Sequence, residues 1–354
     1  MGADSGVGSG LGSGVGSGVG GGLDKGRAGE VRFGGRRLGA ESERMRLLVR
    51  VARLYHEHGV RQPQIAAQLR ISQPRVSRLL KEAAEIGIVR TVVVVPSGVH
   101  ALLEEDLERK YGVEQIIVVD AAGENHDVVA ALGSAGATYL DATLIGGEHL
   151  GISSWSASLL ATVEAMQRRP VRVAEEVVQL IGGVGKGSAQ VQATRLAAHL
   201  ADLTGAEPIF LPAPGLVGSP VARQALSDDD VVRQVVEAWS RLTTVLVGIG
   251  SLNPSPLLQE SGNAISEDEL EALRGLGAVG DVCLRFFDAE GRLIDSPLEE
   301  RILGIPAADL RRVPRRIAIA GGRRKTAAIR AALKGGWVNT LITDVGVAEE
   351  LLND

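Results

Sequence analysis

The chain has 354 residues, of which 45% are hydrophobic and 23% are charged, with a formal net charge of -5. This length predicts a small domain together with a larger one of about 200 to 250 residues. No apolar stretch of about 18 residues escapes a charge or a glycine run, which excludes a membrane-spanning helix. The single Cys283 excludes an intramolecular disulfide framework and a cysteine metal site, so a reducing cytoplasm is the expected compartment.

The charges are distributed unevenly along the chain. Residues 41–95 contain ten positive and five negative groups, whereas residues 96–354 contain 23 positive and 35 negative groups. A basic segment joined to an acidic body is typical of a compact module that binds a polyanion such as DNA. The positive charge alone is explained equally well by a solvated surface. The order of apolar and polar residues in the segment must therefore distinguish the two interpretations.

Residues 1–40 repeat Gly, Ser and Val and contain little apolar bulk. Because ordering glycines is entropically costly, this segment is predicted to be a disordered tail with no specific role. From Arg44 to Gly59 the apolar residues recur at helical spacing, which predicts a first helix.

Two further helices are predicted in residues 62–86. Pro63 can open a short helix that has Ile65, Ala66 and Leu69 on one side. After a turn at Arg70 and Ile71, Ser72 is placed to cap the next helix. The apolar residues of that helix, which fall on one face, are Val76, Leu79, Leu80 and Ala83.

The opposite face of this second helix is polar and cationic. Its residues, which we predict to contact DNA, are Gln73, Arg75, Ser77, Arg78 and Lys81. Arginine can pair with guanine, glutamine with adenine and lysine with phosphate in a major groove. The run IVRTVVVV that follows predicts a strand that would form a wing, so residues 41–95 are interpreted as a winged helix-turn-helix domain. An ordinary amphipathic helix pair is the alternative for the pattern in isolation.

Residues 96–112 are interpreted as a linker helix and residues 113–354 as the larger domain. In the latter, β-rich runs such as QIIVVD, LGIS, EVVQLIG, TTVLVGIG, RRIAIAGG and NTLITD alternate with helical segments. This alternation predicts an α/β fold with a doubly wound, mostly parallel sheet covered by helices on both faces. A ligand crevice is then expected beyond the carboxyl ends of the strands.

From residue 44 to residue 352 the chain resembles the SorC family of sugar-responsive transcription regulators, which is sometimes grouped with the deoxyribonucleoside regulators. The resemblance rests on QIAAQLRISQPRVSRLLKEAAEIGIV followed in order by GISSWSASL, VVQLIGG, FLPAP, VGIG, GAVGD, AGGRRKTAAIRAAL and LITD. It implies a large domain with the sugar-phosphate isomerase and glucosamine-phosphate deaminase fold, used as a sensor without turnover. It also implies a homo-oligomer, a tetramer or a dimer, on operator DNA.

The chain departs from the family pattern at three places. Arg70 stands where the family commonly has glycine, so a less tight turn is expected. Trp155 is followed by Ser156, Ala157 and Ser158, without the basic residue of the usual effector loop. After VGIG the chain lacks an arginine-rich helix, which speaks against a doubly phosphorylated effector.

The strand-end motifs supply the expected effector site. Serines that open a helix in GISSWSASL can surround a phosphate, Lys325 adds a cation at another helix start, and Asp281 can accept hydrogen bonds from sugar hydroxyls. The candidate effector-binding residues are Gly151, Ser153, Ser154, Trp155, Ser158, Gly182, Gly183, Gly250, Asp281 and Lys325. Taken singly, the serine turn can be a helix cap, Lys325 a surface charge and Asp281 a loop cap.

No catalytic residue, metal site or cofactor is predicted. The six histidines stand in unrelated contexts, and GGVGKGSA lacks the spacing of a nucleotide-binding phosphate loop. The sequence therefore predicts a transcriptional regulator of carbohydrate-metabolism genes, controlled by a sugar or sugar phosphate. The alternative is a sugar-phosphate isomerase- or deaminase-like enzyme fused to a DNA-binding module.

Overall fold

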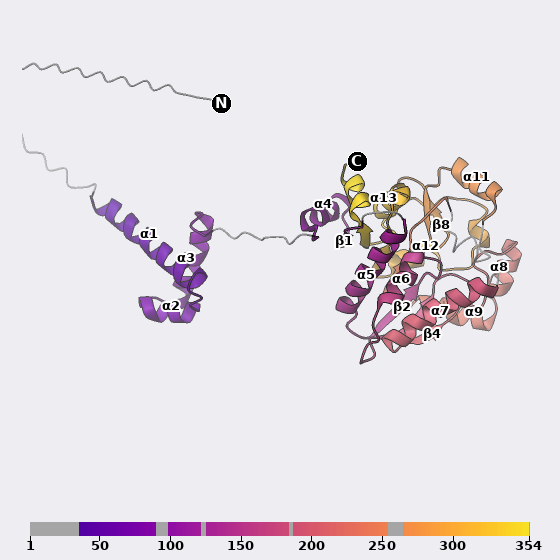
Figure 1. The fold of residues 1–354 in the computed structure, drawn as a ribbon, viewed down its shortest axis with the longest axis horizontal. Helices are drawn as coiled ribbons and strands as arrows, with labels where there is room; N and C mark the ends of the chain where they lie inside the picture. The colour runs from indigo at the N-terminus through magenta and orange to yellow at the C-terminus, as the bar shows by residue number, and fades with distance from the viewer. Residues whose placement is uncertain (1–34, 90–97, 122–124, 184–186, 254–264, 354) are drawn as a thin grey trace, which may run out of the picture. The chain divides into compact units, whose positions relative to one another are not determined.

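The structure, a computed structural model, describes residues 35–89, 98–121, 125–183, 187–253 and 265–353 (Figure 1). The chain divides into two compact units, residues 1–93 and residues 94–354. Most of the predicted tail, residues 1–34, and most of the predicted wing strand, residues 90–97, lie outside the described residues.

The N-terminal unit contains three helices, α1 (Gly35–His56), α2 (Gln62–Leu69) and α3 (Gln73–Glu85). Helix α1 begins nine residues before Arg44, where the apolar periodicity begins, because Arg, Leu and Ala also favour helix. The buried side chains that form the core of this unit are Leu48, Val51, Ala52, Ile65, Ala66, Val76, Leu79 and Ala83. All of them belong to the apolar faces that the sequence pattern indicates for these helices.

The turn between α2 and α3 is tight, contrary to the expectation from its arginine. Arg70 adopts a left-handed conformation, with φ 53° and ψ 43°, and its N–H donates to the carbonyls of Ala66 and Ala67. This is the helix-ending geometry that glycine adopts without a steric penalty. Backbone hydrogen bonds therefore keep the turn tight. The cost falls on the backbone of the exposed Arg70, which is strained.

The body is built on a seven-stranded sheet in the order β1-β10-β9-β5-β2-β3-β4. Every pairing in this sheet is parallel. Its strands are β1 (Gln115–Val119), β2 (Glu148–Ile152), β3 (Ala174–Gln179), β4 (Glu207–Ile209), β5 (Thr244–Val247), β9 (Arg315–Ile319) and β10 (Thr340–Asp344). The predicted α/β fold with a parallel sheet is confirmed.

Helices cover both faces of the sheet, and two hydrophobic clusters mark the two sides. One cluster contains side chains of α5 (Asn125–Thr143), α6 (Ala157–Ala165) and α7 (Gly187–Thr204). The other contains side chains of α4 (Ala101–Tyr111), α9 (Asp230–Trp239), α12 (Ala307–Arg312), α13 (Thr326–Lys334) and α14 (Val345–Asn353). Successive residues of a strand contribute to opposite clusters, as the period of two requires.

A smaller antiparallel sheet adjoins the body through a third hydrophobic cluster. Its strands are β6 (Gly250–Ser251), β7 (Gly280–Val282) and β8 (Arg285–Phe287). The remaining elements are helices α8 (Pro220–Ser227) and α11 (Glu267–Gly275) and the short 3-10 helices η1 (Glu299–Arg301) and η2 (Arg323–Lys325). The third cluster joins α11 and β8 to Trp155, so the small sheet is packed beside the end of β2.

Helix α4, predicted as a linker, packs against the body and protects an edge of its sheet. Leu107 is fully buried in the core, and the Lys110 ammonium donates to the carbonyl of Leu351. The carboxylates of Glu108 and Glu104 accept hydrogen bonds from the Ile116 and Val118 N–H groups, at 2.8 and 2.9 Å. These edge-strand donors would otherwise face solvent or another chain.

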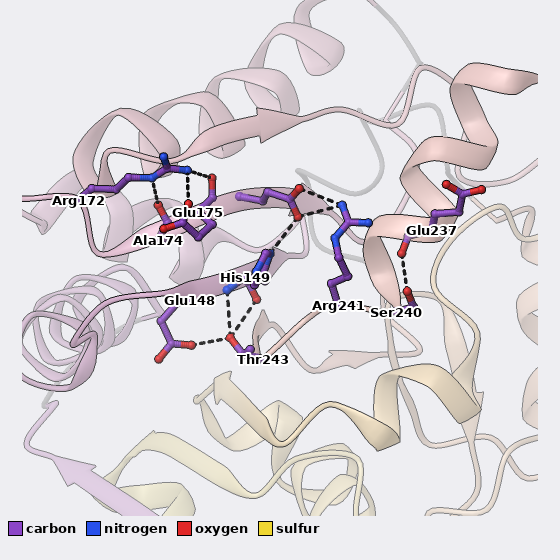
Figure 2. Close-up of polar contacts among 10 residues, drawn as sticks. Glu148, His149, Arg172, Ala174, Glu175, Glu237, Ser240, Arg241 and Thr243 are labelled. Atoms are coloured by element: carbon purple, nitrogen blue, oxygen red, sulfur yellow. Dashed lines mark hydrogen bonds and ion pairs between the residues drawn. The ribbon is translucent and has the colours of Figure 1, made fainter.

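A polar network holds the amino ends of β2, β3 and β5 together (Figure 2). The Arg241 guanidinium donates to both carboxylate oxygens of Glu176, and the His149 ring lies 3.0 Å from the same carboxylate. Burial acts to raise the pKa of Glu176, but Arg241 and His149 outweigh it and leave that pKa below its usual value. Thr243 in turn donates to Glu148. These contacts fix the strand register at the end of the sheet opposite the predicted crevice.

Across the described helices, none combines the length and apolar character that crossing a membrane would require. Within the same residues, no group of three or more His, Cys, Asp or Glu side chains is arranged to hold a metal ion.

Replacing Arg70 by Gly is expected to stabilise the N-terminal unit by about 0.5–1 kcal/mol, because glycine adopts φ 53° without strain. Urea unfolding of the full chain, followed by a probe in the N-terminal unit, measures the change. Arg70→Ala is the matched control, since it removes the same exposed side chain and keeps the positive φ. Equal stability of the Gly and Ala variants would contradict the assignment of strain.

Candidate DNA-binding and effector-binding sites

The outer face of α3 presents the predicted DNA-contacting side chains together. Val76, Leu79 and Ala83 are buried against α1 and α2, which fixes the orientation of the helix. All five predicted residues are exposed on it, namely Gln73, Arg75, Ser77, Arg78 and Lys81. The helix therefore offers long hydrogen-bond donors on the side away from its core.

Few contacts restrain these side chains. The Arg78 guanidinium makes a 3.3 Å hydrogen bond to the Pro74 carbonyl, and Lys81 lies 3.9 Å from Glu85 with both side chains largely exposed. An exposed ion pair of this kind contributes little, so Lys81 can exchange it for a phosphate. Ser72 occupies the N-cap position as predicted, but its side chain makes no capping hydrogen bond.

The body has its crevice where the order of the strands reverses. From β2 the chain continues to β3 and β4 on one side, whereas β5, β9 and β10 follow on the other. The carboxyl ends of β2 and β5 therefore diverge into separate loops, and ligands bind at such a switch point in open α/β sheets. A cavity of about 350 Å³ lies here, lined by Ser153 after β2 and by Gly248, Ile249 and Gly250 after β5.

Six of the predicted effector-binding residues line this cavity, although they are spread over more than 170 positions of the chain. They are Ser153, Trp155, Ser158, Gly250, Asp281 and Lys325. The parallel sheet brings most of them together because β2, β5 and β9 all end on the same side, and the small sheet adds Asp281 of β7, which pairs with Gly250. The Trp155 indole is buried, and its N–H lies 3.4 Å from the Gly182 carbonyl.

The other four predicted residues lie beside the cavity and not in its lining. Gly151 packs within the sheet, where a Cβ would meet Leu180 and Val245. Gly182 packs against the backbone of residues 213–215, and Gly183 forms a bridge with Pro214. Ser154 is buried, and its hydroxyl has no hydrogen-bond partner among the described residues.

Two helices begin at the cavity wall. Ser156 caps α6, its hydroxyl accepting from the Leu159 N–H, and Ala157 and Ser158 of the first turn line the cavity. Lys325 occupies the N-cap position of α13 and lines the cavity as well. A helix start carries partial positive charge and free N–H groups, so the two together favour an anion in this cavity.

Asp281, which is buried, and Lys325, which is half-buried, are charged groups that line the cavity. Burial raises the pKa of Asp281 to about 6, against an opposing hydrogen bond from the Leu284 N–H and the attraction of Lys325. Burial lowers the pKa of the Lys325 ammonium, and Asp281 acts in the opposite direction. Both groups therefore lose hydration in the folded protein that a polar ligand would replace.

Two glycines and Asp344 shape the loops around these charges. A Cβ on Gly250 would lie 1.9 Å from an Asp281 carboxylate oxygen, so only glycine lets β6 approach that carboxyl. Gly322, at φ 89°, donates its N–H to Asp344, which also accepts from the Val347 N–H. Asp344 thus organises the loop behind Lys325, as its position at the end of β10 suggests.

Several lining residues were not predicted from the sequence. Val128 and Val129 come from α5, Ile181 follows β3, and Cys283 and Leu284 form the turn between β7 and β8. Their apolar side chains carry no chemical signal in a sequence. Arg324 also lines the cavity, and its place beside Lys325 in AGGRRK was the available indication.

Comparison with known proteins agrees with this architecture. The family model described as "Putative sugar-binding domain" matches residues 98–353. The deoxyribonucleoside regulator of Bacillus subtilis is 34% identical over 319 residues, covering 89% of this chain and 99% of that protein. The sorbitol operon regulator of Klebsiella pneumoniae is 32% identical over 316 residues, covering 88% and 99%. The crystal structure of full-length SorC from Klebsiella pneumoniae matches with a TM-score of 0.66 at 31% identity, covering 88% and 99%.

A helix-turn-helix unit and a ligand-sensing α/β body together define a one-component transcription regulator. The chain belongs to the SorC family of transcriptional regulators, and its body is the family's sugar-binding domain. The relatives are transcriptional regulators and not enzymes, so the isomerase or deaminase that the sequence left as an alternative is set aside.

Replacing Asp281 by Asn is expected to stabilise the body at pH 8 by up to about 3 kcal/mol, because it removes a buried charge. The folded protein holds the Asp281 proton more tightly than the unfolded chain does. The wild type therefore loses stability as the pH rises from about 4 through about 6, and the advantage of the variant disappears below that window. Denaturant unfolding between pH 4.5 and pH 8 measures this difference. Asp295→Asn, at an exposed position, is the control, and a pH-independent gain for Asp281→Asn would contradict the prediction.

Proposed function

We propose that the chain is a sequence-specific regulator of carbohydrate-metabolism genes that binds double-stranded operator DNA through α3 and responds to a singly phosphorylated sugar or polyol. The observation that carries the proposal is the cavity at the sheet switch point. There the starts of α6 and α13, the Lys325 side chain and the Asp281 carboxyl line the same cavity.

The chemistry of the cavity supports a small anionic polyol. The helix starts and Lys325 suit a phosphate, Asp281 suits hydroxyl donors, and Trp155 offers an apolar face to a sugar ring. A volume of about 350 Å³ is at the small end for ligand sites, which suits a single sugar. Among the lining residues the cations are Lys325 and Arg324, which supports one phosphate rather than two.

The exposed face of α3 supports readout of a major groove. Arg75 and Arg78 can each pair with a guanine, and Gln73 with an adenine, while Lys81 and Ser77 suit the phosphate backbone. A single helix of this length reads only a few base pairs. Two or more copies on neighbouring half-sites would supply the affinity of an operator, so we propose that the chain acts as a homo-oligomer, a tetramer or a dimer.

The names of two relatives support the effector class, since one regulator is named for deoxyribonucleosides and another for the sorbitol operon. Because its proposed partners are DNA and a small metabolite, we place the regulator in the cytoplasm. We propose no membrane partner, cofactor or metal for it.

Replacing Arg75 and Arg78 by Ala is expected to abolish discrimination between the operator and unrelated duplexes, each lost guanine contact costing roughly 1–3 kcal/mol. The operator is first selected by the wild-type chain from a random duplex library, and affinities are measured by fluorescence anisotropy at fixed salt. Arg312→Ala, an exposed arginine on α12, is the control and should leave discrimination unchanged. Retained sequence preference in the double variant would reject the role of α3.

Replacing Lys325 by Met is expected to weaken effector binding by roughly tenfold or more, since a charge-assisted hydrogen bond contributes about 1.5–3 kcal/mol. A thermal-shift screen of hexose, pentose and polyol phosphates, each beside its unphosphorylated form, identifies the ligand, and calorimetry gives its dissociation constant. Lys334→Met, an exposed lysine of the same helix, is the matched control. An unchanged dissociation constant in Lys325→Met would reject the anion site.

A further inference from the structure

The turn between β7 and β8 has an unusual backbone for its residue types. Val282 pairs with Arg285 across the hairpin, so the loop consists of Cys283 and Leu284 alone. Both have positive φ, 54° and 61°. A two-residue hairpin with two such residues normally contains Asn and Gly, because side chains with a Cβ are strained there. Cys283 and Leu284 are instead both buried in the protein.

Neighbouring groups hold this strained turn in place. The Leu284 N–H donates to a carboxylate oxygen of Asp281 at 2.9 Å, and the Cys283 side chain is hydrogen-bonded to that of Ser153. The Leu284 side chain packs in the third hydrophobic cluster with Trp155 and Ile181. A strained backbone conformation persists only where the surrounding contacts enforce it. Such conformations are concentrated at ligand sites and at switch regions.

The groups that hold the turn are also groups of the effector cavity. Asp281, Cys283, Leu284, Ser153 and Trp155 all line it. One carboxylate oxygen of Asp281 accepts the hydrogen bond from the Leu284 N–H. The other oxygen lies beside Gly250, where a Cβ would otherwise stand. A sugar hydroxyl that donates to this carboxyl therefore acts on the same group that braces the turn, and can draw it away from the Leu284 N–H.

The residue after the turn connects it to a distant part of the body. The Arg285 guanidinium donates to the Gly304 and Ile305 carbonyls at 2.8 and 3.0 Å and contacts Glu299 at 2.6 Å. Residues 299–305 make further contacts with the rest of the body, because the Arg301 guanidinium donates to the Val217 carbonyl and to the Glu269 carboxylate. They thereby reach α11 and the segment before α8, and both helices lie at the same end of the body in Figure 1.

We propose that the β7–β8 turn is the conformational switch of this regulator, in which a polyhydroxylated ligand takes up Asp281, releases the strained turn, and shifts Arg285 with residues 299–305. The inference rests on the proposed function only for the place where the effector binds. The strain and its brace are properties of the ligand-free protein, so they can be tested without knowing the effector.

The first experiment tests the strain by comparing Cys283→Gly with Cys283→Ala in the full chain. Both remove the thiol, and only the Ala variant keeps a Cβ that is strained at φ 54°. Gly also loses a buried methyl group and raises the entropy of the unfolded chain, and both effects act against it. The melting temperature of the Gly variant should exceed that of the Ala variant by several degrees. Ala278→Gly is the control at a buried position without positive φ, where Gly should lower the melting temperature. A Cys283→Ala protein at least as stable as Cys283→Gly would overturn the proposal.

The second experiment tests the brace and its relay by hydrogen exchange of the ligand-free full chain. Asp281→Ala should speed exchange in peptides that cover residues 282–287 and 299–305 by at least about fivefold relative to the wild type. Asp281→Asn, which keeps an acceptor oxygen for Leu284, should exchange like the wild type. Unchanged exchange of residues 299–305 in the Ala variant, or equal effects of the Ala and Asn variants, would overturn the proposed relay.

The third experiment adds ligands, with D-ribose 5-phosphate, sorbitol 6-phosphate and inorganic phosphate as probes. A sugar phosphate that raises the melting temperature should speed exchange of residues 282–287 in the wild type and much less in Cys283→Gly. Inorganic phosphate, which has no polyol, should not. If no probe of the sugar-phosphate class binds, the proposed effector fails, while the first two experiments still decide the switch. A bound sugar phosphate that leaves this exchange unchanged would refute the switch alone.

Discussion

The parallel direction of all seven strands is the constraint on which the proposed effector site depends. Because every strand ends on the same side, loops from distant parts of the chain meet there, and the reversal of order between β2 and β5 opens a crevice. At the other end of the sheet, the network around Glu176 fixes the strand register. The polar network thus lies at the amino ends of the strands, and the cavity lies at their carboxyl ends. The helices α6 and α13 then begin at that cavity and direct partial positive charge into it.

The buried Asp281 and the half-buried Lys325 explain why the cavity suits a polar ligand. Each group has lost water on folding, which the opposite shifts of their pKa values record. The proposed ligand, with one phosphate and several hydroxyls, would restore partners to both groups at once. The same Asp281 braces a strained turn, so ligand recognition and backbone geometry depend on one carboxyl. In the proposed switch, this shared dependence lets a small molecule bias a conformational equilibrium of the body.

The sequence was sufficient to predict the α/β class, the strands of the large sheet and six residues of the cavity lining. The polar strand-end residues, such as Ser153 and Lys325, were predictable because their types match anion and sugar chemistry. The apolar wall was not, because Ile181 or Val128 has no distinguishing feature in one sequence. Nor was the geometry at Arg70, Cys283 and Leu284, since positive φ at residues other than glycine depends on tertiary contacts. Gly151 illustrates the opposite error, a glycine required by sheet packing that looks like part of a ligand loop.

We propose that recognition of a metabolite by the body alters how the N-terminal unit binds DNA. The most direct test is the affinity of the full chain for its selected operator, measured by anisotropy with and without a saturating sugar phosphate that raises its melting temperature. We expect the operator affinity to change by roughly tenfold or more, in the range of ordinary allosteric coupling, with no change for an unrelated duplex. An identical operator affinity at saturation, with ligand binding confirmed in the same sample, would contradict it.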